Sequence, residues 1–151
     1  MSRVLMVCLG NICRSPLAEG ILKSKIDTRT IHVDSAGTGG WHVGELPDAR
    51  SIEVARKYGI DLTDQRCRKF LASDFDNFDL IYVMDQSNYY DVLALARTED
   101  DKSKVQFILN EIHANENLEV PDPYYGGAMG FENVFEMLDK ACEMIARKLT
   151  K

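Results

Sequence analysis

The sequence predicts an α/β fold in which a parallel sheet of four strands carries helices on both faces. Short apolar segments alternate along the chain with longer segments whose apolar residues recur at helical spacing. Strands that alternate with helices in this way form parallel sheets. The length of 151 residues suits one domain, and the chain contains no internal repeat or low-complexity stretch. We therefore expect a single domain over residues 1–151, with ligands bound at the carboxyl ends of its strands.

The first half of the chain reads as strand, loop, helix and strand. We expect a strand over residues 4–7, which are all apolar, and then a turn. A helix follows from Ser15, with Pro16 in its first turn. One buried face of this helix carries apolar residues at helical spacing, namely Leu17, Ala18, Ile21, Leu22 and Ile26. A second strand is expected over residues 31–33, before a Gly-rich loop over residues 37–44.

The second half repeats this alternation. We expect a helix over residues 49–58, which Gly59 ends as a left-handed cap. Strands are expected over residues 80–84 and 105–109, with a helix over residues 89–97 between them. A long last helix follows, and its apolar stripe contains Phe131, Val134, Phe135, Leu138, Cys142, Ile145 and Leu149.

Charge and composition exclude several classes of function. The formal net charge of −6 argues against broad nucleic-acid binding, which needs a basic face, so any anion site must be local. No apolar run approaches the roughly 20 residues that cross a bilayer, and the N-terminus lacks the features of a signal peptide. We therefore expect a cytoplasmic protein without a membrane partner.

The cysteines and histidines indicate neither a disulfide framework nor a metal site. A chain with 45% hydrophobic residues needs no disulfides, so its four cysteines are expected to be free thiols. Cys67 and Cys142 have no local motif and favour a structural role. The histidines are scattered along the chain with a spacing unlike that of metal ligands. We assign no metal and no cofactor.

The chemistry concentrates directly after the first predicted strand, where Cys8 and Arg14 are separated by five residues. The N–H groups of a tight loop and of a first helical turn together form a site for a tetrahedral oxyanion. Gly10 permits the backbone to bend, and Asn11 tolerates a left-handed conformation. Arg14 can bind two phosphate oxygens at once. The positive field of Arg14 and the loop amides, together with a hydrogen bond from Ser15, favours the thiolate form of Cys8. Cys8 is therefore the expected nucleophile, with phosphate as the electrophile.

A proton donor for the leaving group is expected at Asp122, which lies between two prolines that restrict the backbone. Tyr124 and Tyr125 follow it, and Trp41 lies in the Gly-rich loop. These rings are expected to wall the entrance and to stack against an aromatic leaving group. The expected substrate is therefore an aryl phosphate.

These motifs resemble those of the low-molecular-weight protein tyrosine phosphatase family, and the likeness covers essentially the whole chain. It includes residues 8–16 and the segments Asp34-Ser35-Ala36-Gly37, Pro47-Asp48-Ala49-Arg50, Met84-Asp85-Gln86-Ser87-Asn88 and Asp122-Pro123-Tyr124-Tyr125. The resemblance implies a three-layer, doubly wound fold with a phosphate loop between the first strand and the first helix. It also implies hydrolysis of phosphotyrosine in a partner protein through a phosphocysteine, with inorganic phosphate as product. A monomer or a weak dimer is expected.

The resemblance assigns roles to individual residues. Cys8 matches the family's nucleophile, Arg14 its phosphate-binding arginine and Asp122 its general acid. The expected substrate-binding residues include the rest of the loop, and they are Leu9, Gly10, Asn11, Ile12, Cys13, Ser15, Trp41, Tyr124 and Tyr125.

Other matched residues support the loop. Ser15 matches the serine that stabilises the thiolate, and Asn11 matches the asparagine that holds the loop through a serine matching Ser35. Gln65 stands where mammalian members carry a histidine that bonds to this asparagine, and its amide can still donate. Cys13 matches a cysteine that can form a reversible disulfide with the nucleophile, so we expect redox sensitivity.

The same residues are compatible with three other classes of function. A protein-arginine phosphatase carries a threonine where this chain has Ile12, which favours phosphotyrosine. An arsenate reductase of the same fold needs further cysteines after the third strand, and residues 85–101 contain none. A non-catalytic phosphate-binding module is a further class. At single positions, Cys8 can be a buried apolar residue, Ser15 an N-cap and Asp122 a turn residue.

Overall fold

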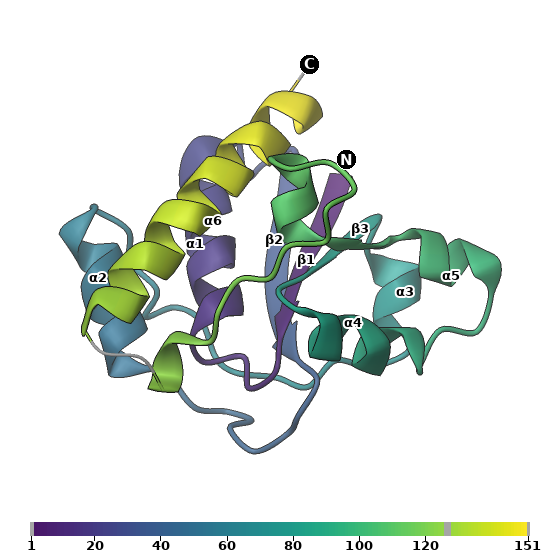
Figure 1. Ribbon diagram of the computed structural model, residues 1–151, viewed down its shortest axis with the longest axis horizontal. Helices are drawn as coiled ribbons and strands as arrows, with labels where there is room; N and C mark the ends of the chain where they lie inside the picture. Colours follow the sequence, from purple (N-terminus) through teal and green to yellow (C-terminus); the bar gives the residue numbers. More distant parts are fainter. Residues whose placement is uncertain (1, 126–127, 151) are drawn as a thin grey trace.

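The centre of the molecule is a four-stranded parallel sheet in the order β2-β1-β3-β4. The computed structural model describes residues 2–125 and 128–150, with Tyr125 and Ala128 described by their backbone alone. Its strands are β1 (Ser2–Cys8), β2 (Ile31–Gly37), β3 (Leu80–Val83) and β4 (Val105–Phe107). Helices cover both faces of this sheet (Figure 1), which confirms the predicted fold class.

The helices divide between the two faces. One face carries α1 (Arg14–Lys25), α2 (Ala49–Lys57) and α6 (Ala128–Leu149). The other face carries the shorter helices α3 (Asp74–Asn77), α4 (Gln86–Leu93) and α5 (Glu99–Ser103).

The side chains of β1 alternate between two apolar cores. Val4 and Met6 belong to the core that contains the buried faces of α1 and α6, whereas Leu5 and Val7 belong to the core beside α3 and α4. A strand that is buried on both faces is apolar throughout, which is why residues 4–7 do not alternate with polar residues.

The predicted helix over residues 89–97 was wrong at both ends, because α4 begins at Gln86 and ends at Leu93. Its start is set by Asp85, whose Oδ1 accepts a hydrogen bond from the amide of Asn88 at 2.8 Å. This side chain is an N-cap that satisfies an amide of the first turn.

The strand boundaries also differ from the prediction. β2 runs on to Gly37, because residues 34–37 continue to pair with the end of β1 despite the polar side chains of Asp34 and Ser35. β4 ends at Phe107, and a 3-10 helix η1 (Ile108–Glu111) replaces the rest of the predicted strand. Among the described residues, no helix is long and apolar enough to cross a membrane.

Candidate active site

The loop between β1 and α1 forms an anion site made of backbone amides. Asn11 has a φ of 57°, so the loop bends at an asparagine in the left-handed conformation. The φ of Gly10 is not positive, so the bend does not require a glycine at that position. Across the part of the chain that the structure describes, the amide N–H groups of residues 10–15 donate to no protein acceptor. They are therefore available to an oxyanion at the start of α1.

The end of β2 and the two residues that follow it pack against this loop. The amides of Thr38 and Gly39 donate to the carbonyls of Cys8 at 3.0 Å and of Leu9 at 2.8 Å. A Cβ on Gly37 would lie 2.9 Å from the carbonyl oxygen of Leu9 and 3.0 Å from the amide nitrogen of Asn11. The absence of a side chain on Gly37 therefore lets the loop pack directly on the strand.

A chain of buried hydrogen bonds leads from the sulfur of Cys8 into α1. Ser35 Oγ donates to Glu19 Oε1 at 2.6 Å, so it accepts from Asn11 Nδ2 at 3.0 Å. Asn11 Nδ2 also donates to Ser15 Oγ at 2.9 Å. The hydroxyl hydrogen of Ser15 is then left for Cys8 Sγ, which lies 3.0 Å away. This order of donors supplies the sulfur with the hydrogen bond that a thiolate needs.

The carboxylate of Glu19 ends this chain and fixes its direction. Its second oxygen accepts from Lys23 Nζ at 2.6 Å, so both oxygens act as acceptors. Burial raises the pKa of Glu19, although Lys23 and Ser35 stabilise its charged form. Ser15 lies inside the first turn of α1, whose N-cap is Cys13, so the N-cap interpretation of Ser15 was wrong.

The expected contact between Gln65 and Asn11 is absent from the described hydrogen bonds. Gln65 Nε2 donates to the carbonyl of Pro16 at 3.0 Å. The side-chain oxygen of Asn11 accepts instead from the amide of Arg68 at 2.9 Å, and its carbonyl accepts from the thiol of Cys67 at 2.9 Å. The segment around Gln65 thus supports the loop through its backbone and through Cys67. Burial raises the pKa of Cys67 to about 11, which keeps this thiol a donor.

Arg14 is buried at the start of α1 and held by acceptors from other segments. Its NH1 donates to Asp85 Oδ2 at 2.7 Å and to the carbonyl of Val120 at 2.9 Å, and its NH2 lies 4.0 Å from Asp122 Oδ2. Burial opposes the charge, but Cys8, Asp85 and Asp122 together raise the pKa of Arg14. Asp85 is therefore a site residue, although no motif in the sequence predicted a role for it. The available signal was its position directly after a buried strand.

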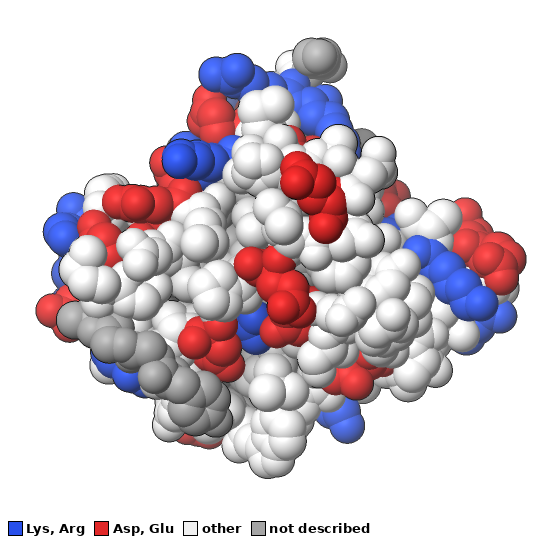
Figure 2. All heavy atoms as spheres, in the orientation of Figure 1, with Lys and Arg blue, Asp and Glu red and all other residues white. Residues whose placement is uncertain are grey.

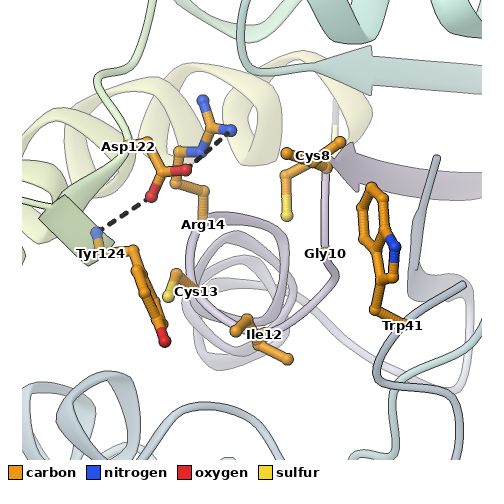
Figure 3. A pocket seen from close by; sticks show the side chains of 9 residues that line it. Cys8, Gly10, Ile12, Cys13, Arg14, Trp41, Asp122 and Tyr124 are labelled. Atoms are coloured by element: carbon orange, nitrogen blue, oxygen red, sulfur yellow. Dashed lines mark hydrogen bonds and ion pairs between the residues drawn. The ribbon is translucent and has the colours of Figure 1, made fainter. Parts of the chain in front are cut away.

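Asp122 and the aromatic residues close the pocket above the loop (Figure 3). Asp122 Oδ1 accepts from the amide of Tyr124 at 2.9 Å, which fixes the carboxylate beside Arg14. The cavity of about 170 Å³ is lined by Cys8, Leu9, Gly10, Ile12, Cys13, Arg14, Trp41, Asp122 and Tyr124. Figure 3 shows the rings of Trp41 and Tyr124 on opposite sides of this cavity. The side chain of Tyr125 lies outside the described residues.

The cysteines are all free thiols, as expected. Cys13 lines the pocket, and burial, with the nearby Asp48, raises its pKa to about 12. Its disulfide with Cys8 stays a prediction. Cys142 is fully buried and donates to the carbonyl of Ala18 at 3.6 Å, consistent with a structural role.

The positive charge of this site is local. Figure 2 shows Lys and Arg side chains mainly at the edges of the face, whereas Asp and Glu side chains gather near its middle. An acidic chain with net charge −6 therefore holds a single buried arginine at its amide-lined loop.

The fold and the site define a phosphate-binding α/β protein with a thiol at the base of its pocket. The chain belongs to the low molecular weight phosphotyrosine protein phosphatase family, whose model matches residues 3–151. Its relatives include a low molecular weight protein-tyrosine-phosphatase of Streptomyces coelicolor, 41% identical, with 92% of this chain and 88% of the relative covered. The family is one of hydrolases that act on protein phosphotyrosine.

Solved structures agree with this assignment. A protein tyrosine phosphatase from Entamoeba histolytica is similar with a TM-score of 0.92 and 40% identity, covering 99% of this chain and 97% of that one. A Drosophila arginine phosphatase is similar with a TM-score of 0.89 and 34% identity, covering 100% and 99%. The fold is therefore shared by proteins that are named for two different phosphorylated residues.

Proposed function

We propose that this chain hydrolyses phosphotyrosine in proteins through a phosphocysteine on Cys8, with Asp122 as the general acid. The observation that carries the proposal is the shared cavity. Cys8, Arg14 and Asp122 line one small pocket with aromatic walls, together with Gly10, Ile12 and Cys13 of the loop whose amides donate to no acceptor in the described part of the chain. These are the nucleophile, the oxyanion donors and the acid that phosphate transfer requires.

The steps follow from the chemistry of these groups. The thiolate of Cys8 attacks phosphorus, the bond from phosphorus to the phenolic oxygen breaks, and Asp122 transfers its proton to that oxygen. Arg14 and the loop amides hold the other phosphate oxygens and balance the charge that develops on them. A water molecule then attacks the phosphocysteine while the carboxylate of Asp122 takes its proton. Inorganic phosphate leaves and the thiolate is restored.

The walls of the pocket support an aromatic leaving group. Trp41 and Tyr124 are 69% and 46% exposed, and both line the cavity, so the ring surface that each presents to the cavity can contact a phenyl group. Ile12 also lines the cavity and offers no hydrogen-bonding group to a guanidinium. These features favour phosphotyrosine over phosphoarginine.

The arsenate reductase alternative receives no support from the cysteines. An arsenate reductase of this fold passes oxidation along a pair of cysteines in the segment after the third strand. Residues 85–101 of this chain contain no cysteine. Cys142 is buried within α6, in the apolar core. Hydrolysis is therefore the chemistry that we propose.

The test is hydrolysis of aryl phosphates by the wild type, Cys8→Ser and Asp122→Asn, in the presence of a metal chelator. We expect Cys8→Ser to be inactive, because its hydroxyl is not ionised near neutral pH. Asp122→Asn should lower kcat for phenyl phosphate by about 100-fold or more, and much less for 4-nitrophenyl phosphate, whose leaving group needs little protonation. Asp100→Asn is the matched control, because Asp100 is exposed and lies in α5, on the opposite face of the sheet from α1.

Two results would contradict the proposal. Full activity of Cys8→Ser would remove the phosphocysteine, and equal losses by Asp122→Asn on both substrates would remove Asp122 as the acid. Phosphoarginine peptides in parallel would show which phosphorylated residue is preferred.

A further inference from the structure

A second hollow lies directly beside the catalytic pocket. Its lining includes Leu9, Trp41 and Leu95, together with the charged residues Lys69 and Asp91. Leu9 and Trp41 line the catalytic pocket as well, so these two side chains form the partition between the two hollows. A ligand in the catalytic pocket can therefore extend into this hollow across one pair of side chains.

The indole that forms this partition is held in place by its own loop. A Cβ on Gly39 would lie 1.9 Å from Cζ3 of Trp41, so the ring rests against the backbone of Gly39. The amide of Gly39 donates to the carbonyl of Leu9 at 2.8 Å, which ties this loop to the phosphate loop. The indole is 69% exposed, but its contact with Gly39 fixes its position next to the catalytic loop.

The chemistry of the hollow suits an uncharged, apolar occupant. Leu9, Trp41 and Leu95 are 40%, 69% and 43% exposed, and they come from three separate segments to one place. Exposed apolar groups that gather in this way mark binding surfaces more often than scattered single residues do. Lys69 and Asp91 carry opposite charges, so the hollow has no net charge that would select an ionic group.

We propose that this hollow binds an aliphatic side chain that lies close to the phosphotyrosine in the substrate protein. The inference rests on the proposed function, because the phosphotyrosine ring in the catalytic pocket is what brings the flanking residues to the hollow. An extended peptide advances about 3.3 Å per residue, so a residue within about two positions of the phosphotyrosine can reach past one indole. The protein substrates would then share an aliphatic residue at a fixed distance from the phosphotyrosine.

The experiment uses phosphotyrosine peptides in which one leucine occupies, in turn, each position from two before to two after the phosphotyrosine. The remaining positions carry serine, and an all-serine peptide and phenyl phosphate serve as references. The wild type should prefer one leucine position over the all-serine peptide. In Leu95→Ser the ratio of kcat/KM for that peptide to kcat/KM for phenyl phosphate should fall by about fivefold, the loss of part of one leucine contact.

The matched control is Leu118→Ser. Leu118 is 41% exposed, close to the 43% of Leu95, and it lines a different hollow beside α6. We expect the wild-type ratio in this variant. No preference among the peptides, or an equal fall of the ratio in both variants, would overturn the inference while turnover of phenyl phosphate upholds the proposed function. No turnover of phenyl phosphate or of any peptide by the wild type would overturn both.

Discussion

The substitution Asp85→Asn tests how the buried charge of Arg14 is held. One oxygen of Asp85 accepts from Arg14 at 2.7 Å, and the other caps α4 by accepting from the amide of Asn88 at 2.8 Å. An asparagine has a single acceptor oxygen and can keep one of these two contacts. Asn and Asp cap helices about equally well, so the substitution mainly removes the ion pair.

The size of the effect follows from the burial of the pair. Arg14 is 3% exposed and Asp85 is 21% exposed. Breaking a fully buried pair costs about 3–5 kcal/mol. Arg14 retains the carbonyl of Val120 at 2.9 Å and lies 4.0 Å from Asp122, and Asp85 is partly solvated. We therefore expect the free energy of unfolding to fall by about 2 kcal/mol, and Tm by about 4–8 °C for a chain of this length.

Urea unfolding of the wild type, Asp85→Asn and Asp85→Ala measures this directly. The alanine variant should lose about 1 kcal/mol more than the asparagine variant, because it also removes the cap. Asp100→Asn, at an exposed position of α5, is the surface control. A loss under about 0.5 kcal/mol in Asp85→Asn, the range of an ordinary surface substitution, would refute the reasoning.

Two further predictions concern the support of the loop. Gly37→Ala places a Cβ 2.9 Å from the carbonyl of Leu9, so the loop must shift. We expect a loss of about 1–3 kcal/mol in urea unfolding and a clear fall in aryl phosphate turnover, whereas Gly40→Ala, with its nearest neighbour at 3.5 Å, should behave like the wild type. Because burial raises the pKa of Glu19 above its unfolded value, its ionisation costs stability above the folded pKa. Relative to Glu19→Gln, the wild type should gain stability as pH falls from neutral towards about 4.3, and the opposite slope would contradict the assignment.

The sequence predicted the local parts of the site because their geometry is local. A strand, a loop with a thiol and an arginine, and a helix that begins directly afterwards determine most of the anion site by themselves. Cys8, Arg14 and Asp122 could be named because each carries chemistry that has few other uses in such a pattern. The structure brings all three to one cavity.

The partners of these residues depend on long-range packing and were harder to predict. Asp85 could not be paired with Arg14 before the start of α4 and the order of strands were known. Gln65 was expected to contact Asn11, but its amide reaches Pro16 instead. The contact of Cys67 with the carbonyl of Asn11 had no signal in the local sequence at all.

The register of β2 links the stability of the sheet to the shape of the loop. Ser35 pairs with Met6 and Gly37 with Cys8 in the parallel ladder. Alternate residues of a strand face the same side, so the hydroxyl of Ser35 and the bare backbone of Gly37 both face the phosphate loop. A slip by one residue would instead present Asp34 and Ala36 to the loop. The carboxylate of Asp34 cannot donate to Glu19, and a methyl group on Ala36 would fill the space that the loop backbone occupies. The register of β2 is therefore determined by the contacts of Ser35 and Gly37 with the phosphate loop as well as by the apolar core.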